Sequence, residues 1–221
     1  MVEKTIKRLV EDLDADTRLA LDARSIDASG RTLVLYGQLE KSPFLRAVKR
    51  KAEGFGIDVA LNNIPKDGFR HRVVADKETA GRLRNFARWE DVDNLQNDGM
   101  SSVAEAITLL LYCSGMVDGK NITIVGRGHS AKGLAGFLME NNATVTVAHR
   151  HTKSLLEATK GRDIVIYAAQ TIDKPIAYDT TDLVVDLGGC VEHPEWLPCE
   201  YVRGIGPLTV SVLLNRFVSG G

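Results

Sequence analysis

The chain has 221 residues, enough for one large domain or two modest ones, with the hydrophobic (44%) and charged (26%) fractions of an ordinary globular protein. Its formal net charge of −1 gives no excess of positive charge for binding nucleic acid or a membrane surface, so neither is expected as a partner. The 3 cysteines form no C-x-x-C pair and are odd in number, which argues against a disulfide framework and favours a cytoplasmic protein with reduced thiols.

The first part of the chain predicts helices and strands in alternation. Apolar residues at helical spacing favour an amphipathic helix, and Ser42-Pro43 opens another, because proline is tolerated in the first turn. In chain order we expect a helix over 2–22, a strand over 32–36, a helix from Ser42-Pro43 to Gly56, a strand over 57–61 and a short helix over 77–86. The strands within 62–89 are left unassigned.

The second part of the chain repeats the alternation more regularly. Ser101-Ser102 with Glu105 forms a capping box and predicts a helix there. The longest apolar run, 107–117, is too short to cross a bilayer. Further on we expect strands over 121–125, 144–150, 163–168, 183–186 and 201–203, a helix over 130–140, and a closing helix over 207–217. Such alternation is typical of an α/β protein with parallel sheets.

A glycine-rich turn follows the predicted strand over 121–125. Gly126, Gly128 and Ala131 fit the pattern G-x-G-x-x-A between a strand and a helix. In this context the missing side chains let a pyrophosphate approach the positive end of the helix. The turn therefore predicts a dinucleotide site.

Two arginines favour NADP over NAD at this site. Sites that prefer NAD usually place an acidic residue about 20 residues after the glycines, to hold the ribose 2′-hydroxyl. This chain has His149-Arg150 there and Arg127 in the turn, and a guanidinium can bind a 2′-phosphate bidentately. Two solvated surface arginines are the alternative. The predicted cofactor residues are Gly126, Arg127, Gly128, His129, Ser130, His149 and Arg150.

These elements predict two domains. Residues 1–99 form a smaller α/β domain, and residues 100–205 form a Rossmann-type, parallel-sheet nucleotide domain. The closing helix, within 206–221, packs back on the first domain, and a cleft separates the two. His71, His129 and His193 lack partners at metal-ligand spacing, so no metal site is expected.

Four motifs in the second half of the chain match those of one known family. The V-G-R-S turn of that family appears as Val125–Gly128, and its A-T-V-T-x-x-H segment as Ala143–His149. Its V-I-D-V-G strand end appears as Val184–Gly188, and its G-V-G-P-M-T loop as Gly204–Thr209. The last motif, at this distance from the nucleotide turn, is quite specific. Together the motifs resemble the bifunctional methylenetetrahydrofolate dehydrogenase/cyclohydrolase (FolD-like) family, best over about residues 118–217.

The amino-terminal half is shortened and divergent. Ser42 and Lys49 keep the spacing of the family's S-x-x-Y-x-x-x-K, but Leu45 replaces the tyrosine. The D-V-D-G motif appears as Asp91–Asn94, the P-C-T-P turn is replaced by Met100–Val103, and Q-L-P-L-P has no counterpart. The resemblance thus covers the nucleotide half more completely than the substrate half.

The resemblance implies a two-step activity on a folate. The first step oxidises 5,10-methylenetetrahydrofolate with NADP, and the second hydrolyses the methenyl product to 10-formyltetrahydrofolate. It makes Lys49 the catalytic residue of hydrolysis, assigns Asp93 to the pterin ring, and places Gly204, Gly206 and Pro207 in the loop between nicotinamide and folate. Tyr36 is a further candidate for stacking on the pterin. A homodimer through the nucleotide domains is also implied.

Other interpretations stay open. Lys49 could lie along the surface of its helix, Asp93 could be an exposed turn carboxylate, and Tyr36 could be a core residue. A non-catalytic NADP-binding or regulatory relative would explain the divergent amino-terminal half. An NADP oxidoreductase for another small substrate, such as a shikimate-like acid, would explain the nucleotide unit but less readily the Gly204–Thr209 loop.

Overall fold

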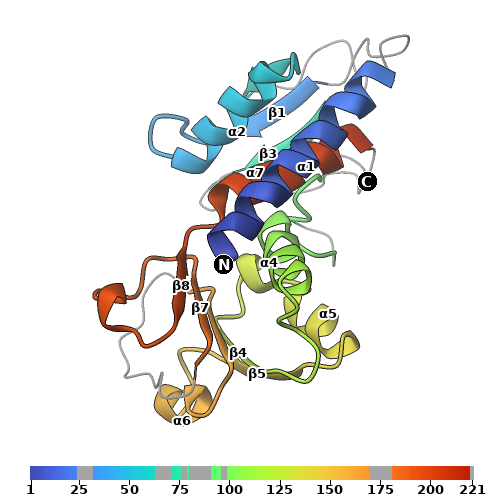
Figure 1. Cartoon of the computed structure of the whole chain (residues 1–221). Coiled ribbons are helices and arrows are strands. Elements are labelled where there is room, and N and C mark those ends of the chain that lie inside the picture. The colour runs from blue at the N-terminus through green and yellow to red at the C-terminus, as the bar shows by residue number, and fades with distance from the viewer. Residues whose placement is uncertain are drawn as a thin grey trace. The chain divides into compact units, whose positions relative to one another are not determined.

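The computed structural model describes residues 1–23, 32–62, 71–75, 79, 91–95, 99–169 and 181–219. The chain divides into two compact units (Figure 1). One unit contains residues 1–7 and 103–205, and the other contains residues 8–102 and 206–221. We call them the nucleotide unit and the amino-terminal unit, and describe each by itself.

The amino-terminal unit contains a parallel three-stranded sheet in the order β2-β1-β3. Its strands are β1 (Thr32–Tyr36), β2 (Val59–Leu61) and β3 (His71–Ala75). Helix α2 (Pro43–Gly54) connects β1 to β2; the Ser42 side chain caps it by accepting a hydrogen bond from the Leu45 backbone N–H at 3.2 Å. The sequence missed β3, which lies in the unassigned segment and pairs along the whole length of β1.

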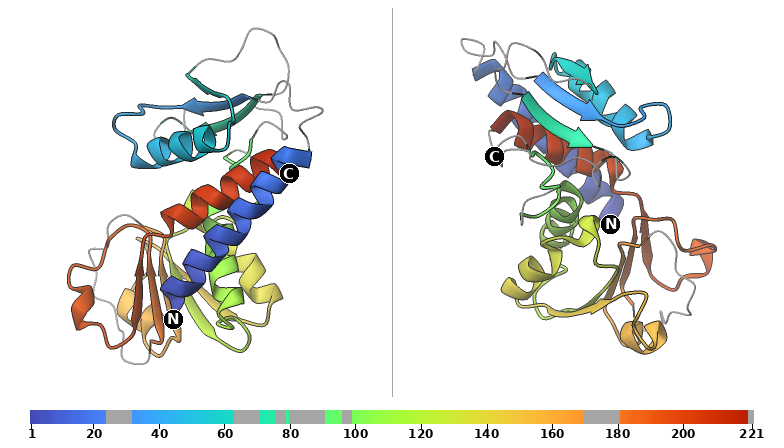
Figure 2. Two further views of the ribbon diagram at one scale, coloured as in Figure 1. Left: turned by 45° about the horizontal axis from the view of Figure 1, so that its top comes forward. Right: turned by 180° about the vertical axis from the view of Figure 1, so that it is seen from behind.

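Two helices from the ends of the chain complete this unit. From Arg8 onward α1 (Val2–Ala23) belongs to it, as does α7 (Gly206–Ser219), and the two lie side by side (Figure 2). The core of the unit joins one face of the sheet to α2 and α7. Its fully buried members include Leu33, Leu35, Leu45, Val48, Val74, Leu213 and Leu214. Leu45, at the position of the family's tyrosine, is thus a core residue that is 1% exposed.

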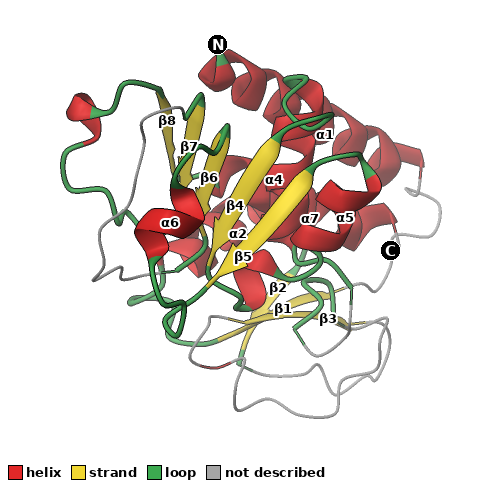
Figure 3. Ribbon diagram, turned by 90° about the horizontal axis from the view of Figure 1, so that it is seen from below, coloured by secondary structure: helices red, strands yellow, loops and turns green. Residues whose placement is uncertain are grey.

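The nucleotide unit is built on a parallel five-stranded sheet in the order β5-β4-β6-β7-β8 (Figure 3). The strands are β4 (Asn121–Val125), β5 (Thr144–Ala148), β6 (Ile164–Tyr167), β7 (Leu183–Asp186) and β8 (Glu200–Arg203). Between β4 and the next strands come the 3₁₀ turn η1 (His129–Ala131) and helices α5 (Leu134–Glu140) and α6 (Leu155–Thr159). A second 3₁₀ turn, η2 (Pro194–Trp196), precedes β8. Helix α4 (Ser102–Cys113) leads into β4.

The middle strands β4, β6 and β7 are buried on both faces, which explains their nearly continuous apolar runs. The edge strands β5 and β8 are partly exposed. One face packs against α6 through Val125, Val165, Tyr167, Val184 and Leu155. Alternation sends the intervening side chains, such as Ile122 and Ile164, to the opposite face. The expected α/β fold with parallel sheets is therefore confirmed.

Most predicted elements agree with the structure within a few residues, including the helix over 2–22 and the closing helix. The helix predicted over 130–140 is wrong at its start, as described below. The helix predicted over 77–86 lies almost wholly outside the described residues. No helix among the described residues is both long and apolar enough to cross a membrane.

Candidate functional site

The predicted cofactor residues gather at the carboxyl edge of the five-stranded sheet. Strands β4 and β5 are parallel neighbours with Val125 opposite Ala148, so the loops that follow them leave from the same edge. The Gly126 N–H extends this pairing by donating to the Ala148 carbonyl at 2.7 Å. The glycine turn and the His149-Arg150 pair, distant in sequence, therefore lie next to each other. In open parallel sheets, ligands bind beyond the carboxyl ends of the strands, at the point where the strand order reverses.

Position 126 requires a glycine for two reasons, its backbone conformation and the lack of room for a side chain. Its φ of +119° is rarely adopted by residues with a side chain. A Cβ added there would lie 2.8 Å from the carbonyl carbon of Ala168, just beyond β6. The first glycine therefore allows the backbone after β4 to pass closely over the end of β6.

The segment after the turn corrects the sequence prediction. The predicted helix does not begin at Ser130; His129–Ala131 form the 3₁₀ turn η1, and α5 starts only at Leu134. Gly133, with φ +81°, breaks the chain direction between them, because a left-handed residue cannot continue a helix. The sequence predicted the end of a continuous helix next to the glycines, as the place where a pyrophosphate binds. The structure has a short 3₁₀ turn with its backbone N–H groups there instead.

Gly128 leaves open space at this edge. A Cβ built on it meets no atom within 4 Å, and Arg127 and Gly128 are both exposed. His129 and Ser130 are half-buried behind them. A missing side chain with nothing packed against it fits the predicted pyrophosphate approach, and these residues could hold a dinucleotide.

The chain after β5 makes a tight turn. The Thr152 N–H donates to the His149 carbonyl at 2.7 Å, and the Thr152 hydroxyl oxygen accepts from the His149 N–H at 2.8 Å. Arg150 is exposed at the tip of this turn. The guanidinium predicted to bind a 2′-phosphate is thus carried by a turn closed by two hydrogen bonds.

A fully buried carboxylate stands at the end of β7. The Asp186 side chain is 0% exposed and accepts hydrogen bonds from Gly188 N–H at 3.1 Å, Val191 N–H at 2.9 Å and Tyr201 hydroxyl at 3.0 Å. Three donors to one carboxylate satisfy the strong hydrogen-bonding demand of a buried charge. Asp186 therefore shapes the loop that leaves the carboxyl edge after β7.

The loop after β7 forms a hydrogen bond to the segment against which the glycine turn packs. The Cys190 thiol donates to the Ala169 carbonyl at 3.1 Å, and Ala168 is the residue against which Gly126 packs. Burial raises the pKa of the Cys190 thiol, and the charge of Asp186 raises it further. Cys190 is thus held as a neutral thiol, which is a poor nucleophile.

Tyr201 gives the first testable prediction. Burial, and then its hydrogen bond to Asp186, raise the pKa of Tyr201 to about 12 from 10.0. A folded-state pKa above the unfolded one stabilises the protein at lower pH, and this stability is lost as pH rises from about 10 through about 12. Tyr201→Phe should therefore flatten the fall in urea stability over this range, whereas Tyr112→Phe, at a 62% exposed site, should leave it unchanged. Equal slopes in wild type and Tyr201→Phe would contradict the assignment.

The predicted substrate residues belong to the amino-terminal unit, except Gly204, which lies in the nucleotide unit after β8. Gly206 and Pro207 form the start of α7. Tyr36 ends β1 half-buried, and burial raises its pKa. Lys49 is 31% exposed on α2 and pairs with Glu53 one turn further along the same helix.

Asp93 is buried rather than an exposed turn carboxylate. It is 4% exposed, and its Oδ1 accepts the Ser102 N–H at 2.8 Å, at the start of α4. A carboxylate at a helix N-terminus satisfies an otherwise unpaired N–H and is favoured by the helix dipole. Asp93 therefore has a structural function at α4, while its role toward a pterin stays a prediction.

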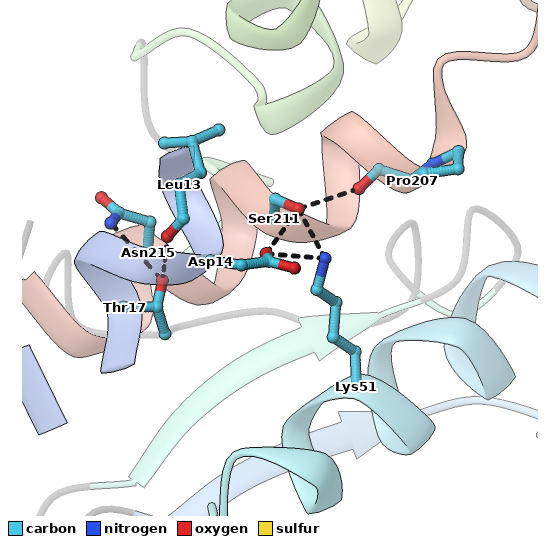
Figure 4. Close-up of polar contacts among 7 residues, drawn as sticks. All are labelled: Leu13, Asp14, Thr17, Lys51, Pro207, Ser211 and Asn215. Atoms are coloured by element: carbon cyan, nitrogen blue, oxygen red, sulfur yellow. Dashed lines mark hydrogen bonds and ion pairs between the residues drawn. The ribbon is translucent and has the colours of Figure 1, made fainter. Parts of the chain in front are cut away.

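The sequence missed a polar cluster that joins three helices of the amino-terminal unit (Figure 4). The Lys51 ammonium lies 2.7 Å from Asp14 Oδ1 of α1 and donates to the Ser211 hydroxyl of α7 at 2.6 Å. Ser211 in turn donates to Asp14 at 2.9 Å. Lys49 and Lys51 flank the apolar face of α2 on opposite sides, which the helical period of 3.6 dictates. Periodicity placed both lysines on α2, but it could not show that the second one meets α1 and α7.

A known family model matches most of the nucleotide unit. Residues 101–192 match the family model described as tetrahydrofolate dehydrogenase/cyclohydrolase, NAD(P)-binding domain. Over these residues the chain is similar to that NAD(P)-binding domain. The resemblance in the sequence motifs is thereby confirmed, together with the expected dinucleotide-binding character of the domain.

Curated relatives extend the similarity unevenly. The chain is 29% identical over 227 residues to the bifunctional protein FolD of Lactobacillus acidophilus, covering 79% of this chain and 80% of that protein. It is 33% identical over 130 residues to FolD of Lactobacillus helveticus, where the match spans 51% of this chain but only 46% of the relative. The stronger identity is therefore confined to about half of such relatives.

Solved structures share the fold over almost the whole chain. FolD of Campylobacter jejuni aligns with a TM-score of 0.72 at 19% identity, covering 99% of this chain and 96% of that one. FolD of Trypanosoma brucei, solved with NADP and an inhibitor, gives 0.70 at 21% identity, with 97% and 94% covered. The NAD-dependent dehydrogenase of Saccharomyces cerevisiae gives 0.76 at 12%, covering 97% and 95%. These identities show a common fold.

Proposed function

We propose that this chain binds NADP and oxidises 5,10-methylenetetrahydrofolate to 5,10-methenyltetrahydrofolate. The observation that carries the proposal is the carboxyl edge of the nucleotide unit, where the loop with the open Gly128 and the turn with Arg150 follow adjacent parallel strands. The match of residues 101–192 to the NAD(P)-binding domain model and the NADP in the structurally similar Trypanosoma brucei enzyme support it. The bound nicotinamide would accept the hydride.

The chain's own residues would contribute mainly binding and orientation. Backbone N–H groups of the loop after Gly126 would hold the pyrophosphate, and Arg127 and Arg150 would bind the 2′-phosphate. Hydride transfer depends on holding two rings in reach of each other and needs few ionisable side chains. This step is therefore compatible with a divergent amino-terminal unit.

The decisive test is a spectrophotometric assay with NADP and methylenetetrahydrofolate, with NAD as the control cofactor. We expect methenyl absorbance with NADP. Arg150→Ala should weaken NADP binding by about tenfold or more and leave NAD binding unchanged, because a charge-assisted hydrogen bond contributes roughly 1.5–3 kcal/mol. Purified protein that neither binds NADP nor forms the methenyl product would rule the proposal out.

Hydrolysis of the methenyl product to 10-formyltetrahydrofolate is the finer part of the proposal, and it assigns the proton transfers to Lys49. Lys49→Met should abolish ring opening while methenyl formation continues, as measured by the decay of methenyl absorbance after NADP is exhausted. Lys51→Met is the matched comparison, because Lys51 already pairs with Asp14 and Ser211. Loss of ring opening in Lys51→Met but not in Lys49→Met would transfer the role to Lys51.

A non-catalytic NADP-binding relative is the second candidate. It is favoured by Leu45, buried where the family has its tyrosine, and by the pairing of Lys49 with Glu53. Calorimetric titration separates the two functions: a regulatory relative binds NADP but not the folate.

The leading proposal also includes a cytoplasmic homodimer formed through the nucleotide units. Sedimentation velocity tests this part, and a monomer would show that it is wrong.

A further inference from the structure

The turn after β5 also brings the side chains of His149, Arg150 and His151 into contact. Its two closing hydrogen bonds place Arg150 and His151 at the central positions. The His151 N–H donates to His149 Nδ1 at 3.2 Å, and the two imidazoles meet edge to face with centroids 5.9 Å apart and planes at 71°. The backbone and ring contacts of His149 therefore hold His151 within the turn.

The His151 ring in turn contacts the arginine. Arg150 Nε donates to His151 Nε2 at 3.1 Å. For Nε2 to accept, the imidazole must be neutral with its proton on Nδ1. The contact engages Nε, so an incoming oxyanion would be met end-on by the two terminal Nη groups of the guanidinium. Such a fork suits two oxygens of one phosphate.

An exposed arginine loses rotamer freedom when it binds a phosphate. A neighbouring group that already restricts the side chain reduces this entropy cost of binding. The reduction applies only to a ligand that contacts the guanidinium. We propose that His151 is a positioning residue that pre-orients Arg150 for a ribose 2′-phosphate, and thereby helps to determine the preference for NADP over NAD. This inference rests on the proposed function only in requiring that the nucleotide binds at this edge.

The test uses two probes that differ only in the 2′-phosphate: adenosine 2′,5′-bisphosphate and adenosine 5′-monophosphate. Calorimetry on the full chain should show that His151→Phe, which keeps an aromatic ring but has no acceptor, weakens the bisphosphate by about three- to tenfold. Affinity for the monophosphate should not change. His151→Gln, whose amide oxygen can again accept from Nε, should recover most of the loss.

A double-mutant comparison separates positioning from direct contact. If His151 acts through Arg150, His151→Phe should have no further effect on bisphosphate affinity in an Arg150→Ala background. Equal weakening of both probes, no weakening of either, or a full His151→Phe effect without Arg150 would overturn the inference. So would a wild-type protein that binds both probes equally.

These outcomes are independent of folate chemistry. A protein that oxidises methylenetetrahydrofolate but shows no His151-dependent preference retains the proposed oxidation and loses the positioning role. A protein that shows this preference but has no activity on the folate retains the positioning role and loses the proposed oxidation.

Discussion

The substitution Gly126→Ala should both destabilise the nucleotide unit and abolish dinucleotide binding. The new Cβ would lie 2.8 Å from the carbonyl carbon of Ala168, and the φ of +119° would be strained for alanine. Strain of this kind and overpacking against backbone each cost about 1–3 kcal/mol, so we expect a loss of roughly 3 kcal/mol in urea unfolding.

Gly128→Ala is the matched control for that prediction. Its φ of −80° suits alanine, and its Cβ would enter open space, so stability should stay within about 0.5 kcal/mol of wild type. The same Cβ would occupy the space assigned to the pyrophosphate, so NADP affinity should fall by about tenfold or more. Unchanged NADP binding in Gly128→Ala would show that the cofactor does not approach this glycine. A stable Gly126→Ala protein would contradict the geometry of the turn.

Asp186→Ala should produce the second large effect. It removes a fully buried carboxylate that accepts from Gly188, Val191 and Tyr201, and leaves these donors without that acceptor. Hydrogen bonds to a charged group contribute about 1.5–3 kcal/mol each but are not additive, so we expect a loss of roughly 3–5 kcal/mol in urea unfolding.

Asp182→Ala, just before the start of the same strand, is the control for Asp186. The Asp182 side chain is 56% exposed and pairs with Lys120 at 3.0 Å, and exposed ion pairs contribute about 0–1 kcal/mol. Asp186→Asn should be intermediate, because the amide keeps one acceptor oxygen but presents an N–H₂ to the remaining donors. If Asp186→Ala and Asp182→Ala proved equally stable, the buried carboxylate would not organise the loop.

Sequence reasoning succeeded best where local rules and tertiary contacts agree. Ser42-Pro43 starts α2 because the serine caps the helix and proline suits its first turn, both decided within a few residues. The middle strands of the nucleotide unit were predictable because strands buried on both faces of a parallel sheet need nearly uninterrupted apolar runs. The strand β3 was missed because its pairing with β1, rather than a pattern of its own, reveals it.

The candidate site shows the same division. Turn chemistry and hydrophobic period are local properties, so they were enough to predict the glycine turn, the two arginines and the parallel α/β order that brings them to one edge of the sheet. Three features become visible only in the folded chain: the helix after Gly126 begins late, Asp93 and Asp186 are buried acceptors, and Lys51 rather than Lys49 contacts both α1 and α7. Burial and pairing depend on residues brought together from distant parts of the chain, and no local pattern specifies which partner a side chain will meet.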